Sequence, residues 1–189
     1  PVNFHLKGFE ALGAQVTVEH GYVKAKAKKL VGTTIYVGRS SVGATVNLML
    51  AACLAEGITV LENAAREPEI VNLALQLNSM GAKIRGAGTN IITIEGVKRL
   101  GRAVHEIIPD RLEVGTFLLA TGMAGGEVVL RDVVPEHLHA LISKLRESGV
   151  EIRDEGGVLV VKSPIGRRPL PTDIETTPYP GFATDFQAL

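Results

Sequence analysis

Residues 77–96 read LNSMGAKIRGAGTNIITIEG, and this pattern occurs three times along the chain. The other two copies are FEALGAQVTVEHGYVKA at 9–25 and LRESGVEIRDEGGVLVVKS at 145–163. Each copy predicts the end of a helix, a left-handed glycine, a short strand, a turn and a second strand. The glycines are evenly spaced by 68 residues: Gly13, Gly81 and Gly149. A constant period of this length indicates a repeated structural module.

The order of elements between these glycines also repeats. The first copy predicts a strand at 33–37, a helix at 44–56, a strand at 58–63 and a helix at 68–80. The second copy predicts a strand at 103–107, a helix at 114–123, a strand at 127–132 and a helix at 135–148. Pro68 and Pro135 suit the first turns of their helices. The sequence therefore predicts an α/β fold of repeated βαβαββ modules, whose helices bury one face against strands.

The two ends of the chain fit incomplete modules. Residues 1–12 predict the second helix of a module whose first strands and helix are absent, and residues 185–189 predict the start of a further helix. We therefore expect a segment that is truncated at both ends. Such a segment leaves apolar faces uncovered, so we expect it to be marginally stable and inactive by itself.

Composition narrows the class of protein. Of 189 residues, 46% are hydrophobic and 21% charged, which is typical of a globular protein with a real core. The net charge is zero, aromatic residues make up 4% and tryptophan is absent, which argues against a nucleic-acid partner. No apolar run reaches the length of a membrane span, so no membrane partner is expected. The single cysteine, Cys53, cannot form an internal disulfide and suits the cytoplasm.

The stretch GRSSVGAT at 38–45 precedes a long apolar run and allows two interpretations. It is not a P-loop, because no lysine followed by a hydroxyl residue comes after Gly43. Serines before a helix are most often N-caps. A helix N-terminus with free N–H groups is also a ready anion site. These residues alone leave both interpretations open.

Three longer strings carry a resemblance to a known family. They are SSVGATVNLMLAACLAEGITVLENAAREPEIVNLALQLNSMGAKI at 40–84, IIPDRLEVGTF at 107–117 and PGFATDFQA at 180–188. They resemble the UDP-N-acetylglucosamine 1-carboxyvinyltransferases. The resemblance implies an inverted α/β barrel fold, with two globular domains of three modules each around a pseudo-threefold axis. Residues 1–108 would then belong to the first, UDP-sugar-binding domain and 109–189 to the second.

The same resemblance implies an activity. Members of this family transfer the enolpyruvyl group of phosphoenolpyruvate to the 3′-hydroxyl of UDP-N-acetylglucosamine and release phosphate, the first committed step of peptidoglycan synthesis. We therefore expect these two small molecules as partners, no metal and no cofactor, and a monomeric enzyme when complete. The family's reactive cysteine precedes the position of Pro1, so it is not Cys53, which we expect to be structural.

The resemblance also implies site residues. The uridine-binding segment falls on Pro1, Val2, Asn3 and Phe4, with His5 adjacent, and the diphosphate-binding segment falls on Arg39, Ser40, Ser41, Val42 and Gly43. Many relatives carry Asp at the position of Asn3 and Lys at that of Arg39. An asparagine can still bond a uracil edge, and a guanidinium can hold two phosphate oxygens.

Asp185 matches the acid that the family places near the sugar 3′-hydroxyl, where it orients or deprotonates that group. From the residues alone, an N-cap is the more common role of an aspartate in this position. Arg66, Glu67 and Glu69 are expected to cap and pair locally.

Two other functions remain open. One is an enolpyruvyl transferase with another acceptor, such as shikimate 3-phosphate. The other is a UDP-sugar-binding relative without catalysis, for which Asn3 is the only hint.

Overall fold

The computed structural model describes residues 2–187, and the chain divides into two compact units, residues 1–107 and 108–189. Unit 1 contains three helices and six strands: α1 (Asn3–Ala11), β1 (Gln15–Glu19), β2 (Tyr22–Lys26), β3 (Thr34–Tyr36), α2 (Val42–Ala52), β4 (Ile58–Glu62), α3 (Pro68–Ser79), β5 (Lys83–Arg85) and β6 (Ile91–Glu95). Unit 2 contains α4 (Arg111–Ala124), β7 (Gly126–Arg131), η1 (Pro135–Leu138), α5 (His139–Glu147), β8 (Glu151–Asp154), β9 (Val158–Ser163) and η2 (Thr184–Phe186). Each unit is described below by itself.

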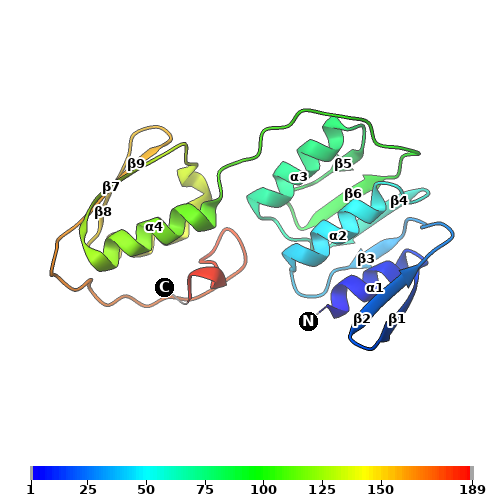
Figure 1. The fold of residues 1–189 in the computed structure, drawn as a ribbon, viewed down its shortest axis with the longest axis horizontal. Helices are drawn as coiled ribbons and strands as arrows, with labels where there is room; N and C mark the ends of the chain where they lie inside the picture. The colour runs from blue at the N-terminus through cyan, green and yellow to red at the C-terminus, as the bar shows by residue number, and fades with distance from the viewer. Residues whose placement is uncertain (1, 188–189) are drawn as a thin grey trace. The chain divides into compact units, whose positions relative to one another are not determined.

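Unit 1 holds one complete βαβαββ module, running from β3 to β6, as predicted. Its sheet has the order β3-β4-β6-β5, in which β3 is parallel to β4 and the other pairs are antiparallel. Burial alternates along β4 and β6, so one face of the sheet is apolar. Helices α2 and α3 lie against this sheet (Figure 1), and the core between them includes Leu48, Leu61, Ile70, Ile92 and Ile94.

The left-handed glycines that end three helices are confirmed. Gly13, Gly81 and Gly149 have φ of 96°, 99° and 90°. In each case the N–H of the next residue bonds the carbonyl five residues before it, at 3.0 Å, 2.9 Å and 3.0 Å for Ala14, Ala82 and Val150. This closing bond is that of a Schellman motif, which requires the left-handed residue. The 68-residue period therefore arises because the same type of helix C-terminus recurs in every copy.

Before the complete module, unit 1 has the α1–β1–β2 end of another copy. Helix α1 packs closely on α2, because a β-carbon at Gly8 would overlap the side chain of Leu48. The antiparallel β1–β2 hairpin pairs with no further strand in the described part of the chain. Its side chains are mostly exposed, including Val18 and Tyr22. An isolated two-stranded ribbon of this kind is marginally stable in water.

Unit 2 repeats the module without its first strand. The sheet order β7-β9-β8 matches β4-β6-β5 of unit 1, and both pairs are antiparallel. The predicted strand at 103–107 is wrong, because residues 101–110 form no regular element. Val104 is fully exposed, and the carbonyl of Glu106 accepts a bond from the Asn72 amide at 3.4 Å. A strand needs a hydrogen-bonded neighbour, and no described strand pairs with this segment.

Helix boundaries differ from the prediction by a few residues. Helix α2 begins at Val42 rather than at residue 44 and ends at Ala52 rather than at residue 56. The predicted helix at 135–148 is a 3-10 turn, η1, followed by α5. Among residues 2–187, no helix is long and apolar enough to cross a membrane.

Cys53 lies directly after α2 and is fully buried, as its assignment to the core predicts. Burial raises the pKa of the Cys53 thiol. The thiolate is the reactive form, so both access and ionisation are reduced in the folded protein.

Cys53 should therefore alkylate slowly. We expect iodoacetamide at pH 8 to modify the folded chain at least about 100-fold more slowly than the chain in 8 M urea, because reaction requires local opening. Mass spectrometry of timed samples measures the two rates. Equal rates in buffer and in urea would show that the α2 end is open and that Cys53 is not part of the core.

Candidate functional site

The start of α2 offers two free hydrogen-bond donors. Ser41 is the N-cap residue, and its Oγ accepts a bond from the Ala44 N–H at 3.3 Å. Within the described residues, the N–H groups of Val42 and Gly43 have no acceptor. Both stand at the positive end of the helix dipole. The serine is thus a cap, and the same helix end can also receive an anion.

Arg39 and Ser40 extend this donor group. The Arg39 side chain is exposed and Ser40 is half-buried. Neither side chain has a hydrogen-bond or ion-pair partner among residues 2–187. Residues 38–43 are called the cradle below. They combine one guanidinium, one free hydroxyl and two backbone donors, a set that suits a diphosphate.

The cradle touches the first turn of α1. Gly38 is left-handed, with φ of 81°, and a β-carbon there would overlap the ring of Phe4. Phe4 therefore packs directly on the backbone of the cradle. His5 lies beside Gly43, since its Cε1 is 3.3 Å from the position that a β-carbon at Gly43 would take.

A polar contact joins the same two helices. The Nδ1 of His5 and the Nδ2 of Asn47 are 2.8 Å apart. Val2 and Asn3 are exposed at the beginning of α1, and Pro1 lies outside the described residues. The structure thus brings Phe4 of the expected uridine segment, and the adjacent His5, to the expected diphosphate segment, although more than 30 residues separate them. Their ligand roles stay predictions.

Asp185 belongs to unit 2, where it is exposed in the short 3-10 helix η2. It is not the N-cap, which is Ala183. Two buried rings hold this turn: Phe182 and Phe186 pack edge to face with centroids 5.9 Å apart. The turn before them needs Gly181, where a β-carbon would overlap the hydroxyl of Thr177. Of the helix predicted at 185–189, Asp185 and Phe186 belong to η2 and Gln187 follows it, while residues 188–189 lie outside the described residues.

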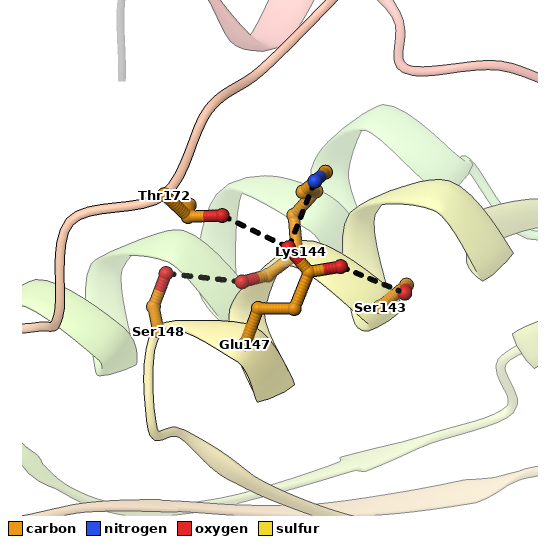
Figure 2. Close-up of polar contacts among 5 residues, drawn as sticks. All are labelled: Ser143, Lys144, Glu147, Ser148 and Thr172. Atoms are coloured by element: carbon orange, nitrogen blue, oxygen red, sulfur yellow. Dashed lines mark hydrogen bonds and ion pairs between the residues drawn. The ribbon is translucent and has the colours of Figure 1, made fainter.

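The segment 164–183 connects β9 to η2 and is tied to the end of α5. The N–H of Leu170 donates to the Ser148 carbonyl at 2.9 Å. Figure 2 shows a second tie, in which the Thr172 hydroxyl donates to Glu147 Oε2 at 3.0 Å. Nearer to Asp185, the Arg111 guanidinium lies 5.7 Å from the centre of the Tyr179 ring. These contacts set the path of the chain toward Asp185.

The Glu147 carboxylate accepts two further hydrogen bonds besides the one from Thr172. Lys144 Nζ donates to it at 2.8 Å and Ser143 Oγ at 3.4 Å, both from α5 (Figure 2). Hydrogen bonds from Lys144, and next from Thr172, hold the pKa of Glu147 below its ordinary value. A lowered pKa means that this contact stabilises the fold above the ordinary glutamate pKa and is lost as pH falls through the lowered value.

Replacement of Glu147 by glutamine should therefore matter at neutral pH and not in acid. We expect Glu147→Gln to lower the thermal midpoint at pH 7 and to converge with the unchanged chain toward pH 3. The matched control is Glu155→Gln, because the exposed Glu155 side chain has no partner among the described residues. Calorimetry between pH 3 and pH 7 measures both. A constant gap at every pH would show that the carboxylate charge is not what holds the segment.

Comparison with known proteins settles the family. The model of EPSP synthase (3-phosphoshikimate 1-carboxyvinyltransferase) matches residues 1–189. The chain belongs to the EPSP synthase family. Within it, the chain is 55% identical over 188 residues to UDP-N-acetylglucosamine 1-carboxyvinyltransferase 1 of Caldanaerobacter subterraneus subsp. tengcongensis, covering 100% of this chain and 45% of that protein. It is also 55% identical over 188 residues to UDP-N-acetylglucosamine 1-carboxyvinyltransferase of Geobacter metallireducens, with the same coverage.

The chain therefore corresponds to a segment of these relatives and spans about 45% of their length. Among solved structures, the enolpyruvyl transferase NikO from Streptomyces tendae aligns with a TM-score of 0.74 at 23% identity, over 88% of this chain and 43% of that one. This likeness concerns the fold, which confirms the expected enolpyruvyl transferase architecture of repeated modules.

The sequence did not identify two side chains that support the cradle, those of Thr45 and Asn63. Thr45 is fully buried, and its Oγ1 accepts a bond from the Ala65 N–H at 3.0 Å. Asn63 donates its amide to the carbonyl of Gly38. An asparagine directly after an alternating strand is a recognisable signal for a left-handed residue, but nothing local predicts its partner 25 residues away.

Glu67 corrects an expectation. It precedes the first residue of α3, but its side chain makes no capping bond. The residue is only 8% exposed, and its Oε2 is buried with no hydrogen-bond partner among residues 2–187. Arg66 is exposed and forms no ion pair within the described chain. The predicted local capping and pairing is therefore wrong for these two residues.

Proposed function

We propose that this chain supplies most of the UDP-sugar site and the acidic residue of an enzyme that transfers the enolpyruvyl group of phosphoenolpyruvate to the 3′-hydroxyl of UDP-N-acetylglucosamine, with release of phosphate. One observation carries this most directly: the two expected binding segments meet at the N-termini of α1 and α2. The names of the relatives that are 55% identical point to the same reaction.

The cradle holds the diphosphate of the nucleotide sugar. The free N–H groups of Val42 and Gly43 and the Ser40 hydroxyl donate to phosphate oxygens, and the Arg39 guanidinium neutralises their charge. The donors of this helix end are fixed before the ligand arrives.

The first turn of α1 holds the uridine. Val2 and Asn3 are exposed there, while Phe4 is fixed against Gly38. The Asn3 amide can both donate to and accept from the edge of the base. Pro1 completes this segment in the proposal.

Asp185 orients the sugar 3′-hydroxyl and accepts its proton as the oxygen attacks phosphoenolpyruvate. An exposed carboxylate is a weak base for an alcohol, so the transfer must be concerted with attack and shielded from water. In this scheme the sugar oxygen bonds to C2 of phosphoenolpyruvate while C3 takes up a proton. C3 then gives up a proton, the double bond re-forms, and phosphate leaves with the electron pair of the broken C2–O bond. The proton accepted by Asp185 passes to solvent. We propose that the complete enzyme is a cytoplasmic monomer. The free, buried Cys53 of this chain is compatible with a reducing compartment.

A chimaeric enzyme tests the proposal. In it, this chain replaces the matching 45% of the Caldanaerobacter relative. Phosphate release is measured with phosphoenolpyruvate and either UDP-N-acetylglucosamine or shikimate 3-phosphate. We expect turnover with the nucleotide sugar and none with the shikimate compound. Turnover with shikimate 3-phosphate alone would favour the second acceptor, and a folded chimaera that binds UDP-N-acetylglucosamine without turnover would favour a non-catalytic relative.

A further inference from the structure

Asn63, at the end of β4, is hydrogen-bonded to the backbone of the cradle. It follows β4 directly and has φ of 56°, a left-handed conformation that asparagine tolerates better than most residues. Its Nδ2 donates to the carbonyl of Gly38, the first residue of the cradle. Beside this bond, the Val37 N–H donates to the Glu62 carbonyl at 2.9 Å. The loop before α2 is therefore fastened to the end of β4 through two successive residues.

The same short segment also fastens the beginning of α2. Two residues after Asn63, the Ala65 N–H donates to the buried Thr45 hydroxyl at 3.0 Å. Residues 63–65 thus bond to the chain on both sides of the free donors of Val42 and Gly43. None of these contacts requires a ligand.

The direction of the Gly38 carbonyl fixes the direction of the Arg39 N–H. A peptide unit is planar and trans, so its carbonyl and the following N–H point in opposite directions. A carbonyl held toward Asn63 turns the N–H of Arg39 away from Asn63. Without the Asn63 amide this peptide can rotate, since Gly38 is a glycine and accepts many backbone conformations.

We infer that Asn63 is a positioning residue for nucleotide-sugar binding: it orients the cradle by holding the Gly38 carbonyl and does not itself touch the ligand. This inference rests on the proposed function, because it names the diphosphate of UDP-N-acetylglucosamine as the group that the cradle receives. Its effect is on binding of the nucleotide sugar and not on phosphoenolpyruvate.

Unit 2 provides a matched control. Asp132 follows β7 as Asn63 follows β4, and its φ is 53°. Its side chain has no hydrogen-bond or ion-pair partner among the described residues. The left-handed residue is thus a feature of both modules, whereas the bond to a cradle carbonyl belongs to unit 1.

The test compares Asn63→Asp with Asp132→Asn. Aspartate keeps the size and the tolerance for left-handed backbone but cannot donate to a carbonyl. In the chimaeric enzyme we expect Asn63→Asp to raise KM for UDP-N-acetylglucosamine roughly tenfold, with kcat and KM for phosphoenolpyruvate changed less than twofold. Asp132→Asn should change none of the three. Asn63→Gly, which keeps the backbone and removes the amide, should also raise KM for the nucleotide sugar.

A readout without substrate separates this inference from the proposed function. In amide NMR spectra of the ligand-free 189-residue chain, Asn63→Asp should shift the signals of Arg39, Ser40 and Ser41, and Asp132→Asn should not. Shifts in those signals without any binding of UDP-N-acetylglucosamine by the unchanged chain would overturn the proposed function but keep Asn63 as the residue that orients the loop. Two results would overturn the inference itself. One is unchanged amide signals in the Asn63→Asp chain. The other is a fall in kcat together with equal rises in KM for both substrates.

Discussion

Replacement of Asp185 by alanine in the chimaeric enzyme should lower kcat by about 100-fold to 10,000-fold, the usual contribution of a positioned acid or base. The Kd for UDP-N-acetylglucosamine should change by less than about threefold, because the proposed diphosphate and uridine contacts are on α1 and α2 in unit 1. Asp185 itself is exposed on a turn that the buried rings of Phe182 and Phe186 hold in place, so its replacement should not disturb the fold of unit 2. Its carboxylate is free to face the substrate, and its loss leaves that anchoring intact.

Asp173→Ala is the control for this prediction. Asp173 is an exposed aspartate on the segment that leads to Asp185, with no side-chain partner in the described chain. Rapid-quench kinetics and calorimetric titration of both variants separate turnover from binding. Near-normal turnover of the Asp185 variant, or equal effects of the two substitutions, would remove Asp185 from the chemistry.

Gly38→Ala should lower both the stability of unit 1 and its affinity for the nucleotide sugar. A side chain at a φ of 81° costs about 1–2 kcal/mol by itself. The new β-carbon would also overlap the Phe4 ring, and overpacking adds about 1–3 kcal/mol. We therefore expect the free energy of unfolding of unit 1 to fall by roughly 2–5 kcal/mol. Affinity for UDP-N-acetylglucosamine should fall about 100-fold, since the cradle and Phe4 must move apart.

Gly21→Ala isolates the two causes. Gly21 has the same φ of 81°, but a β-carbon there would meet nothing within 4 Å. This variant should lose only the backbone contribution, about 1–2 kcal/mol, and no affinity. Urea unfolding and calorimetric titration measure both quantities. If Gly38→Ala proves as mild as Gly21→Ala, Phe4 does not pack on the cradle in solution.

The repeat architecture could be predicted from sequence because its signals are local. Gly13, Gly81 and Gly149 mark helix ends through their own backbone preference, and the strands after them alternate visibly. The serine cap of α2 was predictable for the same reason. The resemblance to relatives of this family then pointed to the residues of the cradle and to Asp185.

Contacts between distant residues could not be predicted in the same way. The strand expected at 103–107 has the right alternation, but strands form only beside a partner, and the sequence does not name one. The packing of Phe4 on Gly38 and the bond from Asn63 to the same glycine join three separate elements. Glu67 shows that a local signal can also mislead. A glutamate before Pro68 suggests a helix cap, but its side chain is buried and makes no capping bond.

The division between units 1 and 2 falls at residues 107 and 108. The assignment of these units to two different domains of the complete enzyme, with a boundary near Pro109, stays a prediction. Limited proteolysis of the chimaeric enzyme, followed by mass spectrometry, would locate the exposed connection.

The most direct measurement is a residue-resolved titration of the 189-residue chain with UDP-N-acetylglucosamine, followed by amide NMR. The proposed site predicts shifts at residues 2–5 and 38–45 with UDP-N-acetylglucosamine and also with UDP, and none with shikimate 3-phosphate. Any shift near Asp185 should require the sugar and be absent with UDP. Unchanged signals at residues 2–5 and 38–45 with the nucleotide sugar, or a response of these residues to shikimate 3-phosphate alone, would contradict a UDP-sugar site at the N-termini of α1 and α2.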